Sequence, residues 1–514
     1  MLWFEQKLFV CVEILYNRGM MRRLFVQPLF VITILLIVPL AFSVFYSGYH
    51  YTYYGDELVH VNTVYLIAHG YRPFKDFFTI YSPLFHYLLL PFFTIYGFTP
   101  ETIQASRFLM IGLFALQLLI GYAFMSKLFT KLTGLIFVLL MLLDPFTVFA
   151  GMQVRPDNLL MLVFFAGVLT LVYAISHRGI FMGHHSALWF VSGCLMGLAV
   201  VISFKSIVMV GVLSLALFVY FLRKQTWRKY FTYVVGGVVA GILFCFLWIV
   251  QGSFRLMIEQ LIVYPKAMSD GIWFPTRLGF FYQPNNTFVY GLAGKPVTWY
   301  IAVLLPIFAL AGILYSLMAF RKQVQKSFWI ITFICMLILQ YAFLYTIKCL
   351  FIQYYLTVNW ILAFFAAIFI TAIVGCIKHP IGKSIMYTLL LIVFLCVSFE
   401  SIRANMQRPH NISQESQNVL MGKRWERISS DSLVYPSLLF RPLSQPIPYG
   451  YFLPEIPLFI QKKYPLPLTT ISDTRVEYLI LTPFHLQFID QGTKLSIEKN
   501  FTNDPTDTEL WVRK

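Results

Sequence analysis

Stretches of apolar residues recur from Pro28 to Phe399, and short polar segments separate them. A helix needs about 20 apolar residues to cross the hydrocarbon core of a bilayer. The pattern therefore predicts an all-α, polytopic membrane region of about 11 transmembrane helices. The expected spans are residues 28–46, 105–126, 133–149, 158–176, 187–203, 206–222, 231–250, 299–320, 328–347, 352–376 and 384–399.

The pattern ends after Phe399, where hydropathy falls, charges of both signs appear and prolines become frequent. Runs of aliphatic residues with Val and Tyr, such as residues 432–440 and 477–481, predict strands of a small α/β domain. The expected organisation is a cytoplasmic N-terminal segment at residues 1–27, a transmembrane domain at 28–399 and a soluble extracytoplasmic domain at 400–514.

The composition agrees with this organisation, since 59% of the 514 residues are hydrophobic and only 12% are charged. The cations behind the net charge of +17 cluster in short loops between the spans. Such loops are typical of the cytoplasmic face of a membrane protein, so nucleic-acid binding is not expected. The seven cysteines form no CxxC pair, and the ten histidines lack a zinc-binding spacing.

Residues 82–97 are apolar, but the segment is short, opens with Ser82-Pro83 and contains Pro91. If it crossed the bilayer, the basic clusters of four later loops would move to the outer face, against the positive-inside rule. We therefore expect an interfacial or re-entrant helix on the extracytoplasmic side. The loops expected on that same face are residues 47–104, 150–157, 203–206, 251–298 and 348–351, followed by the C-terminal domain.

Two adjacent carboxylates, Asp56 and Glu57, follow the first span in a loop rich in tyrosine. A carboxylate held at a partly apolar interface has a raised pKa and is able to take a proton from an acceptor hydroxyl. We interpret Asp56 as the candidate catalytic base and Glu57 as an orienting or substrate-binding residue. A structural alternative is that Asp56 caps the helix that starts near Glu57.

A second acidic position is Asp157, in the Arg155-Pro156-Asp157 turn before the fourth span. Two carboxylate loops that meet on one face would form an acidic pocket able to hold a metal or orient a sugar. Asp157 is thus the second candidate catalytic residue, and Arg155 is a candidate substrate-binding residue. A candidate cofactor is Mg²⁺ or Mn²⁺ bound by Asp56 and Asp157. The alternative is that Asp157 caps the helix and pairs locally with Arg155.

Lys205 is a single charged residue in the turn between two apolar spans, and Lys348 is likewise a single charged residue between two later spans. A charge at membrane depth needs a partner or an exit to water. An ammonium group suits a lipid phosphate at the bilayer surface, so both lysines are candidates for phosphate binding. The alternative for Lys205 is snorkelling to the headgroups. Tyr354 and Tyr355 either bind phosphate or sugar or belong to an interfacial aromatic belt.

Taken in chain order, these segments resemble the motifs of the membrane-embedded GT-C glycosyltransferases. Asp56-Glu57, residues 70–77 and residues 82–84 resemble the first-loop pattern of the branch that contains the protein O-mannosyltransferases and the lipid A aminoarabinose transferases, which is glycosyltransferase family 39-like. Ser82 departs from that pattern, because many relatives have a proline there. Three later segments also resemble motifs of this family. Arg155-Pro156-Asp157 resembles its second acidic motif, Phe204-Lys205 resembles its lysine motif, and residues 353–356 resemble its tyrosine-rich motif.

The resemblance implies an integral-membrane enzyme with a GT-C-like catalytic domain. Such an enzyme transfers a sugar from a polyprenyl-phosphate donor to a lipid, glycan or protein acceptor on the extracytoplasmic face, usually with inversion. Asp56 would be the general base, and Lys205, Lys348 and Arg72 would stabilise the lipid-phosphate leaving group. The active face would be periplasmic in a bacterium and lumenal in the endoplasmic reticulum of a eukaryote. Further candidate substrate-binding residues are Lys75, Asp76 and His86.

Two other functions would also use a lipid-linked saccharide. A transporter or flippase would distribute polar residues through the mid-depth of several spans. A ligase of lipid-linked glycans would rely on arginine and histidine clusters in a large outer loop. The charges of this chain concentrate at one face, and residues 251–298 contain no histidine, so surface transfer is favoured.

The expected position of residues 82–97 can be tested by site-directed labelling. A Thr94→Cys variant should react with a membrane-impermeant thiol reagent added from the outside, because the segment is not expected to cross the bilayer. Cysteines at Lys131 and Lys322 should react only from the cytoplasmic side. Labelling of the Thr94→Cys variant from the cytoplasm alone would reverse the assignment.

Overall fold

The computed structural model describes most of the helical region and part of the C-terminal region. The described residues are 28–50, 55–77, 79–98, 100–176, 185–224, 226–263, 265, 303–346, 352–377, 380–407, 423–424, 427–428, 433–435, 474, 476–481 and 491–514.

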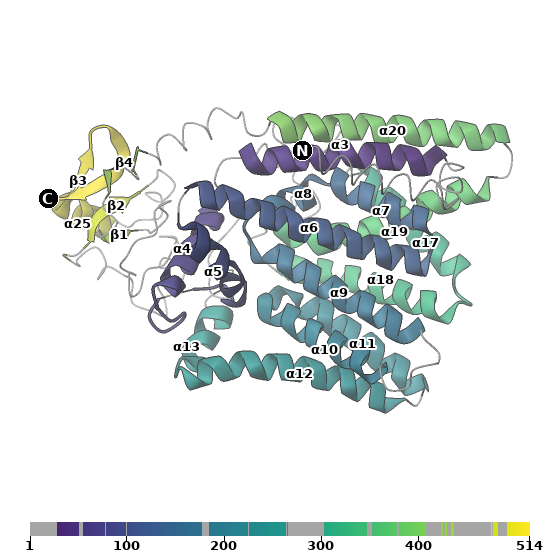
Figure 1. Cartoon of the computed structure of the whole chain (residues 1–514), viewed down its shortest axis with the longest axis horizontal. Coiled ribbons are helices and arrows are strands. Elements are labelled where there is room, and N and C mark those ends of the chain that lie inside the picture. Colours follow the sequence, from purple (N-terminus) through teal and green to yellow (C-terminus); the bar gives the residue numbers. More distant parts are fainter. Residues whose placement is uncertain are drawn as a thin grey trace.

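The membrane region is a bundle of long helices that lie side by side (Figure 1). Its helices are α3 (Pro28–His50), α6 (Pro100–Leu128), α7 (Lys131–Leu143), α8 (Pro145–Met152), α9 (Pro156–Ser176), α10 (His185–Ile202), α11 (Ile207–Lys224), α12 (Trp227–Val250), α17 (Leu305–Ala319), α18 (Val324–Thr346), α19 (Leu356–Cys376) and α20 (Pro380–Gln407). The shorter elements are α4 (Gly55–Ala68), α5 (Leu84–Tyr96), α13 (Phe254–Ile258), the 3-10 turns η1 (Phe204–Ser206) and η5 (Ile352–Tyr355), and the π-helix η2 (Glu259–Val263).

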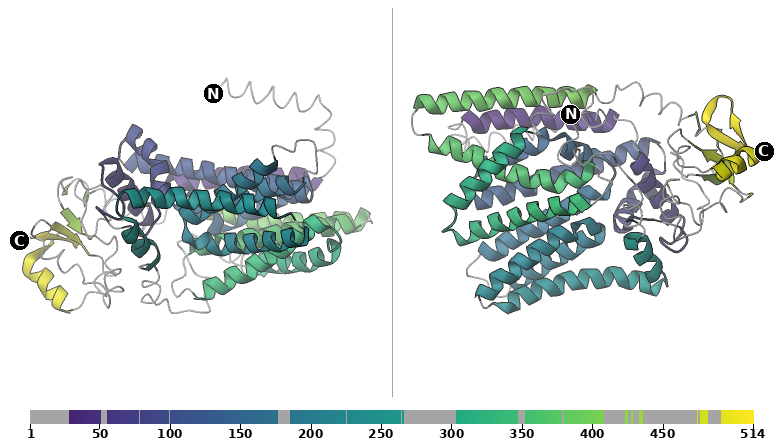
Figure 2. Two further views of the ribbon diagram at one scale, coloured as in Figure 1. Left: turned by 90° about the horizontal axis from the view of Figure 1, so that it is seen from below. Right: turned by 180° about the vertical axis from the view of Figure 1, so that it is seen from behind.

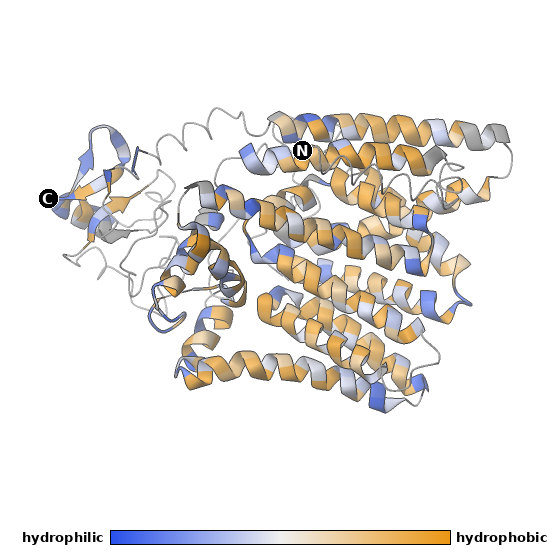
Figure 3. Ribbon diagram, viewed as in Figure 1, coloured by the Kyte–Doolittle hydropathy of each residue, from blue (hydrophilic) through white to orange (hydrophobic). Residues whose placement is uncertain are grey.

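Eight helices within the described residues are long and apolar enough to cross a bilayer, namely α3, α6, α9, α11, α12, α18, α19 and α20. The other three expected spans coincide with shorter apolar helices, α7, α10 and α17. Figure 3 shows apolar residues along the bundle and hydrophilic residues mainly near the helix ends. The chain is therefore a multi-pass helical membrane protein, as the hydropathy pattern predicted.

The expected continuous span at residues 133–149 is wrong, because the helix breaks at Asp144. α7 ends at Leu143, Asp144 has an extended backbone with ψ of 108°, and α8 begins at Pro145. Proline disfavours the helical conformation of the residue before it. The buried Asp144 carboxylate accepts hydrogen bonds from Thr147 and from Nδ2 of Asn359, the latter at 2.9 Å. The hydrogen bond to Asn359 thus joins the break between α7 and α8 to α19.

Helices α10 and α12 approach closely because glycines line their contact. A Cβ at Gly193 would lie 1.9 Å from the carbonyl oxygen of Tyr233, and one at Gly236 would lie 2.2 Å from that of Phe190. Gly193 and Gly197 form a GxxxG sequence, which is typical of helix contacts in membranes. This contact holds α12 against the helix that leads into η1 and Lys205.

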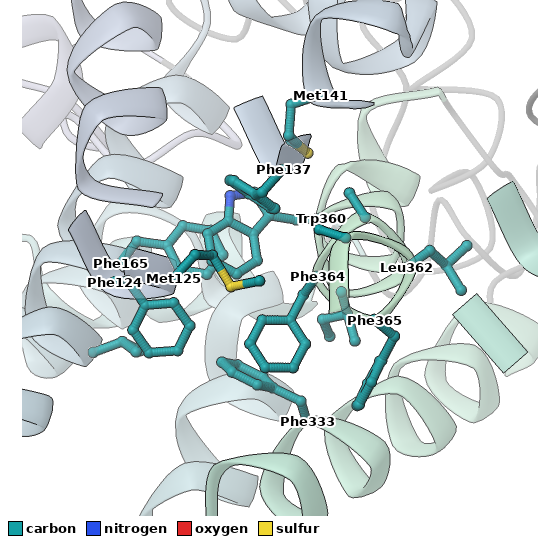
Figure 4. Close-up of a cluster of buried hydrophobic side chains, with 14 of the residues drawn as sticks. Phe124, Met125, Phe137, Met141, Phe165, Phe333, Trp360, Leu362, Phe364 and Phe365 are labelled. Atoms are coloured by element: carbon teal, nitrogen blue, oxygen red, sulfur yellow. The ribbon is translucent and has the colours of Figure 1, made fainter. Parts of the chain in front are cut away.

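Aromatic side chains from several helices fill the centre of the bundle (Figure 4). The ring of Trp360 on α19 stacks on Phe165 of α9, with 3.4 Å between centroids, and meets Phe137 of α7 at 4.6 Å. Phe124 of α6 packs beside them, 6.1 Å from Trp360. Inside a bilayer, such van der Waals packing is a main source of helix association. It fixes α9 against α19, the helices that begin at the candidate site.

Helices α4, α5 and α13 lie together at one end of the bundle (Figures 1 and 2). α5 has 13 residues, too few for the roughly 20 that a spanning helix needs. It buries Phe85, His86, Leu89 and Phe93. This length agrees with an interfacial helix, although the side of the membrane on which it lies stays a prediction.

The described C-terminal residues form a small α/β unit beyond the same end of the bundle (Figure 2). Its sheet has four strands in the order β1-β2-β4-β3, with β1 (Leu433–Tyr435) parallel to β2 (Val476–Ile480). β4 (Asp507–Arg513) is antiparallel to both β2 and β3 (Phe501–Asp504), and α25 (Gln491–Asn500) precedes β3. The predicted α/β character is confirmed, and both predicted strand runs contain a strand.

Candidate active site

Four residues predicted from sequence meet at the end of the bundle where α9 and α19 begin. The Asp157 carboxylate lies 3.4 Å from Nε of Arg155 and 3.9 Å from Nζ of Lys205. The Lys205 ammonium lies 4.0 Å from the centre of the Tyr354 ring, a cation–π contact. Arg155 and Asp157 are buried, whereas the Lys205 side chain is 36% exposed. The structure thus joins the second acidic motif, the lysine motif and the tyrosine-rich motif.

A cavity that is partly open to solvent lies against this group. Asp157, Lys205, Tyr354, Gln340 and Thr357 provide its polar wall. Leucine, methionine and phenylalanine side chains from α9, α11, α18 and α19 form the rest of it. A cavity that is charged on one side and apolar on the other suits an amphipathic ligand.

Two opposite charges, those of Lys205 and Asp157, line the cavity. The buried Arg155 guanidinium also pairs with Asp157, at 3.4 Å. The Lys205 side chain is partly exposed and lies 3.9 Å from the Asp157 carboxylate at the cavity. A partly desolvated cation of this kind attracts an anionic group such as a phosphate.

The local pairing of Asp157 with Arg155 is confirmed, and both Asp157 and Asp56 lie in the first turn of a helix. α9 begins at Pro156, so Asp157 lies inside the first turn, and its carboxylate is directed to Arg155 and Lys205. α4 begins at Gly55, which places Asp56 inside its first turn as well. A negative charge in a first turn is still favoured by the helix dipole.

Glu57, predicted to orient or bind substrate, is completely buried in an ion pair with Arg107 of α6. Its carboxylate accepts hydrogen bonds from Nε of Arg107 at 2.9 Å and from Nη2 at 2.6 Å. It also accepts one from the backbone N–H of Val154 at 3.0 Å, while Nη1 of Arg107 donates to the Gly48 carbonyl at 3.1 Å. The pair therefore links α3, α4, α6 and the turn that carries Arg155 and Asp157.

His86 is buried against a second histidine, His60 of α4. Nδ1 of His60 and Nε2 of His86 are 2.9 Å apart, and both residues have no exposed surface. Burial lowers the pKa of His86 from 6.5 to about 3. Burial also holds the pKa of His60 well below its usual range, and His86, Arg155 and Lys205 lower it further. The pair is therefore neutral and lies within electrostatic reach of the cavity cations.

The loop after α4 is fixed by contacts among its own residues and to α12, α13 and η2. Arg72 and Asp76 form a partly exposed pair with Nε to Oδ2 at 2.8 Å, and hydrogen bonding to Arg72 lowers the pKa of Asp76. Nζ of Lys75 donates to the Gln251 carbonyl at 3.4 Å. Gln260 bridges the loop, since Nε2 donates to the Phe74 carbonyl and Oε1 accepts from the Thr79 N–H, both at 2.9 Å. These loop residues thus have structural partners.

The remaining three predicted residues are Lys348, Asp56 and Tyr355. Lys348 lies outside the described residues, and so does the side chain of Asp56. Tyr355 is half-buried and packs against the central apolar core beside the cavity. The roles of Asp56 and Lys348 therefore stay predictions.

The described side chains contain no group of three or more His, Cys, Asp or Glu residues able to hold a metal ion. Asp157, one of the two predicted ligands, faces two cations instead. Because cations compete for the same carboxylate, its described surroundings do not favour Mg²⁺ or Mn²⁺. A metal ion bound by Asp56 and Asp157 stays a prediction.

Sequence reasoning missed Arg107, His60 and Gln340. Arg107 is a lone cation at the start of a predicted span, and such a charge demands a buried partner. Gln340 is likewise a polar residue within an apolar span. His60 lies one helical turn after Asp56, but its pairing with His86 depends on how α4 meets α5.

No protein-family model and no curated protein matches the sequence. Solved structures do match the fold. ArnT from Cupriavidus metallidurans bound to undecaprenyl phosphate is 12% identical, with a TM-score of 0.60 over 93% of this chain and 97% of that one. The apo oligosaccharyltransferase from Archaeoglobus fulgidus is also 12% identical, with a TM-score of 0.57 over 93% of this chain and 74% of that one.

The chain has the GT-C membrane glycosyltransferase fold. The resemblance inferred from short motifs is therefore confirmed at the level of the fold. At 12% identity, the likeness does not assign the sugar, the acceptor or the role of any single residue.

The buried ion pair predicts an asymmetric effect of substitution. An Arg107→Met variant leaves the Glu57 carboxylate buried without its cation, which should destabilise the fold by about 3–5 kcal/mol. The double variant Glu57→Gln/Arg107→Met should be more stable than this single variant, because no charge remains buried. Thermal unfolding in detergent measures both. An Arg107→Met variant as stable as the wild type would contradict a linking role for the pair.

The histidine pair predicts a loss of stability in acid. Between pH 6.5 and 3 the unfolded chain binds a proton that the folded His86 does not, so stability falls as pH decreases. The slope is about 1.4 kcal/mol per pH unit for one histidine. A His86→Asn variant, which does not titrate, should lose less stability than the wild type between pH 7 and pH 5. Melting curves at the two pH values test this, and equal losses in both proteins would contradict it.

Proposed function

We propose that this protein is an integral-membrane glycosyltransferase that uses a polyprenyl-phosphate sugar donor. The observation that carries the proposal is the cavity beside Lys205, where the ammonium group of a partly exposed lysine adjoins an apolar wall. Such a cavity suits a lipid phosphate, whose headgroup is anionic and whose chain is hydrocarbon. The fold supports it, because ArnT of the same fold has been crystallised with undecaprenyl phosphate.

In the proposed reaction, the acceptor hydroxyl attacks the anomeric carbon and the lipid phosphate departs. Negative charge develops on the phosphate oxygen as the glycosidic bond breaks, and a preorganised cation stabilises that charge. We assign this role to Lys205, and its contacts with the Tyr354 ring and with Asp157 at the cavity support the assignment. Arg155 adds positive charge from the buried side, and Lys348 and Arg72 are further proposed cations.

The proton of the acceptor hydroxyl needs a base, and we assign this role to Asp56. Asp56 is adjacent on α4 to Glu57, whose carboxylate joins that helix to Arg107 and to the turn that carries Asp157, and this supports the assignment. Attack from the face opposite the lipid phosphate would invert the anomeric centre. The acceptor is a lipid, glycan or protein hydroxyl, and the reaction takes place on the extracytoplasmic face.

An Asp56→Asn variant should lose at least about 100-fold in transfer activity, because general-base catalysis contributes that much. The measurement is incorporation of radiolabelled sugar from a polyprenyl-phosphate donor into membrane material. Expression and membrane insertion should stay unchanged. A Glu498→Gln variant, which changes an exposed carboxylate on α25, serves as the matched control. Full activity of Asp56→Asn would refute the assigned base.

A further inference from the structure

Gln340 is a buried polar residue that lines the cavity and that the proposed reaction does not use. It lies on α18 near the end of the helix and is only 4% exposed. Within the described part of the chain, its Oε1 atom is buried and has no hydrogen-bond partner. The residues around it in the cavity wall include Phe343 and Leu344 of the same helix. Its amide therefore has an unsatisfied polar atom in a largely apolar wall.

A buried carbonyl oxygen without a hydrogen-bond partner lowers the stability of a protein by about 1–3 kcal/mol. The presence of Gln340 at this position therefore needs an explanation. A hydrocarbon chain in the cavity could not form a hydrogen bond with Oε1, so the oxygen would still lack a partner. An unprotonated phosphate has no proton to donate to Oε1, and the ammonium of Lys205 in the same cavity wall is a better partner for it. A hydroxyl satisfies the amide in either orientation, because it both donates and accepts a hydrogen bond.

We propose that Gln340 binds a hydroxyl group of the sugar carried by the lipid phosphate and so selects the donor. This inference rests on the proposed function, since it places a phosphate-linked sugar in the cavity. The shared wall supports it, because Gln340 lines the same cavity as Lys205 and Tyr354. A sugar whose phosphate contacts Lys205 has its ring hydroxyls within that cavity, where Asp157 and Gln340 supply hydrogen-bonding groups. Gln340 is thus a specificity-determining residue.

The test compares two ligands on the full-length protein in detergent. One is undecaprenyl phosphate, and the other is the tightest-binding member of a panel of hexosyl and pentosyl undecaprenyl phosphates. A Gln340→Met variant keeps the length and volume of the side chain but cannot pair with a hydroxyl. We expect it to bind the sugar-linked lipid about tenfold more weakly, as for one lost buried hydrogen bond, and to bind undecaprenyl phosphate within about twofold of the wild type.

Two control variants separate this inference from the proposed function. A Gln325→Met variant changes the same residue type on α18, where its Nε2 donates to Ser176 outside the cavity, and should bind both ligands like the wild type. A Lys205→Met variant should weaken both ligands, because both carry the phosphate.

The outcomes are distinguishable. If Gln340→Met weakens the binding of both ligands equally or of neither, the inference about Gln340 is overturned while the proposed function stands. If the wild type binds neither ligand, the proposed function itself fails and the inference falls with it.

Discussion

The buried ion pair between Glu57 and Arg107 is the contact on which the geometry of the candidate site depends. One carboxylate and one guanidinium join the end of α3, the start of α4, the start of α6 and the turn before Asp157. Such a pair is stable in an apolar interior only because nearly all of its hydrogen-bonding groups are satisfied. It therefore specifies one arrangement of the two acidic motifs rather than adding much to overall stability.

The bundle itself is a membrane structure, and its surface and its centre follow different rules. Lipid-facing positions such as Leu35, Phe246 and Ile338 are apolar and exposed, whereas the centre is packed with aromatic rings around Trp360. Polar groups gather where helices end, because these positions give charges access to water. The candidate site is consequently built from the first turns of α9 and α19 and from the η1 turn between α10 and α11.

Much of this arrangement could be predicted, and the failures have physical causes. Asp157, Lys205 and Tyr354 were predicted from local signals, a charge or a tyrosine at the boundary of an apolar span, and they meet in the structure. Glu57 was predicted to orient a group or to bind substrate, and the structure pairs it with Arg107, fifty residues later in the chain. Local sequence shows that a buried charge needs a partner but not which residue supplies it. The break at Asp144 was missed although an Asp-Pro step signalled it.

The sequence by itself determined the membrane class, the end of the bundle at which polar chemistry gathers, and the α/β nature of the C-terminal unit. These properties depend on hydropathy and on local conformational preference, and both can be derived from residues that are consecutive in the chain. Only the tertiary structure decided which side chains share the cavity, that Glu57 is structural, and that His60 pairs with His86. Those outcomes depend on how distant helices pack, because a contact between two helices is set by their whole surfaces rather than by either sequence alone.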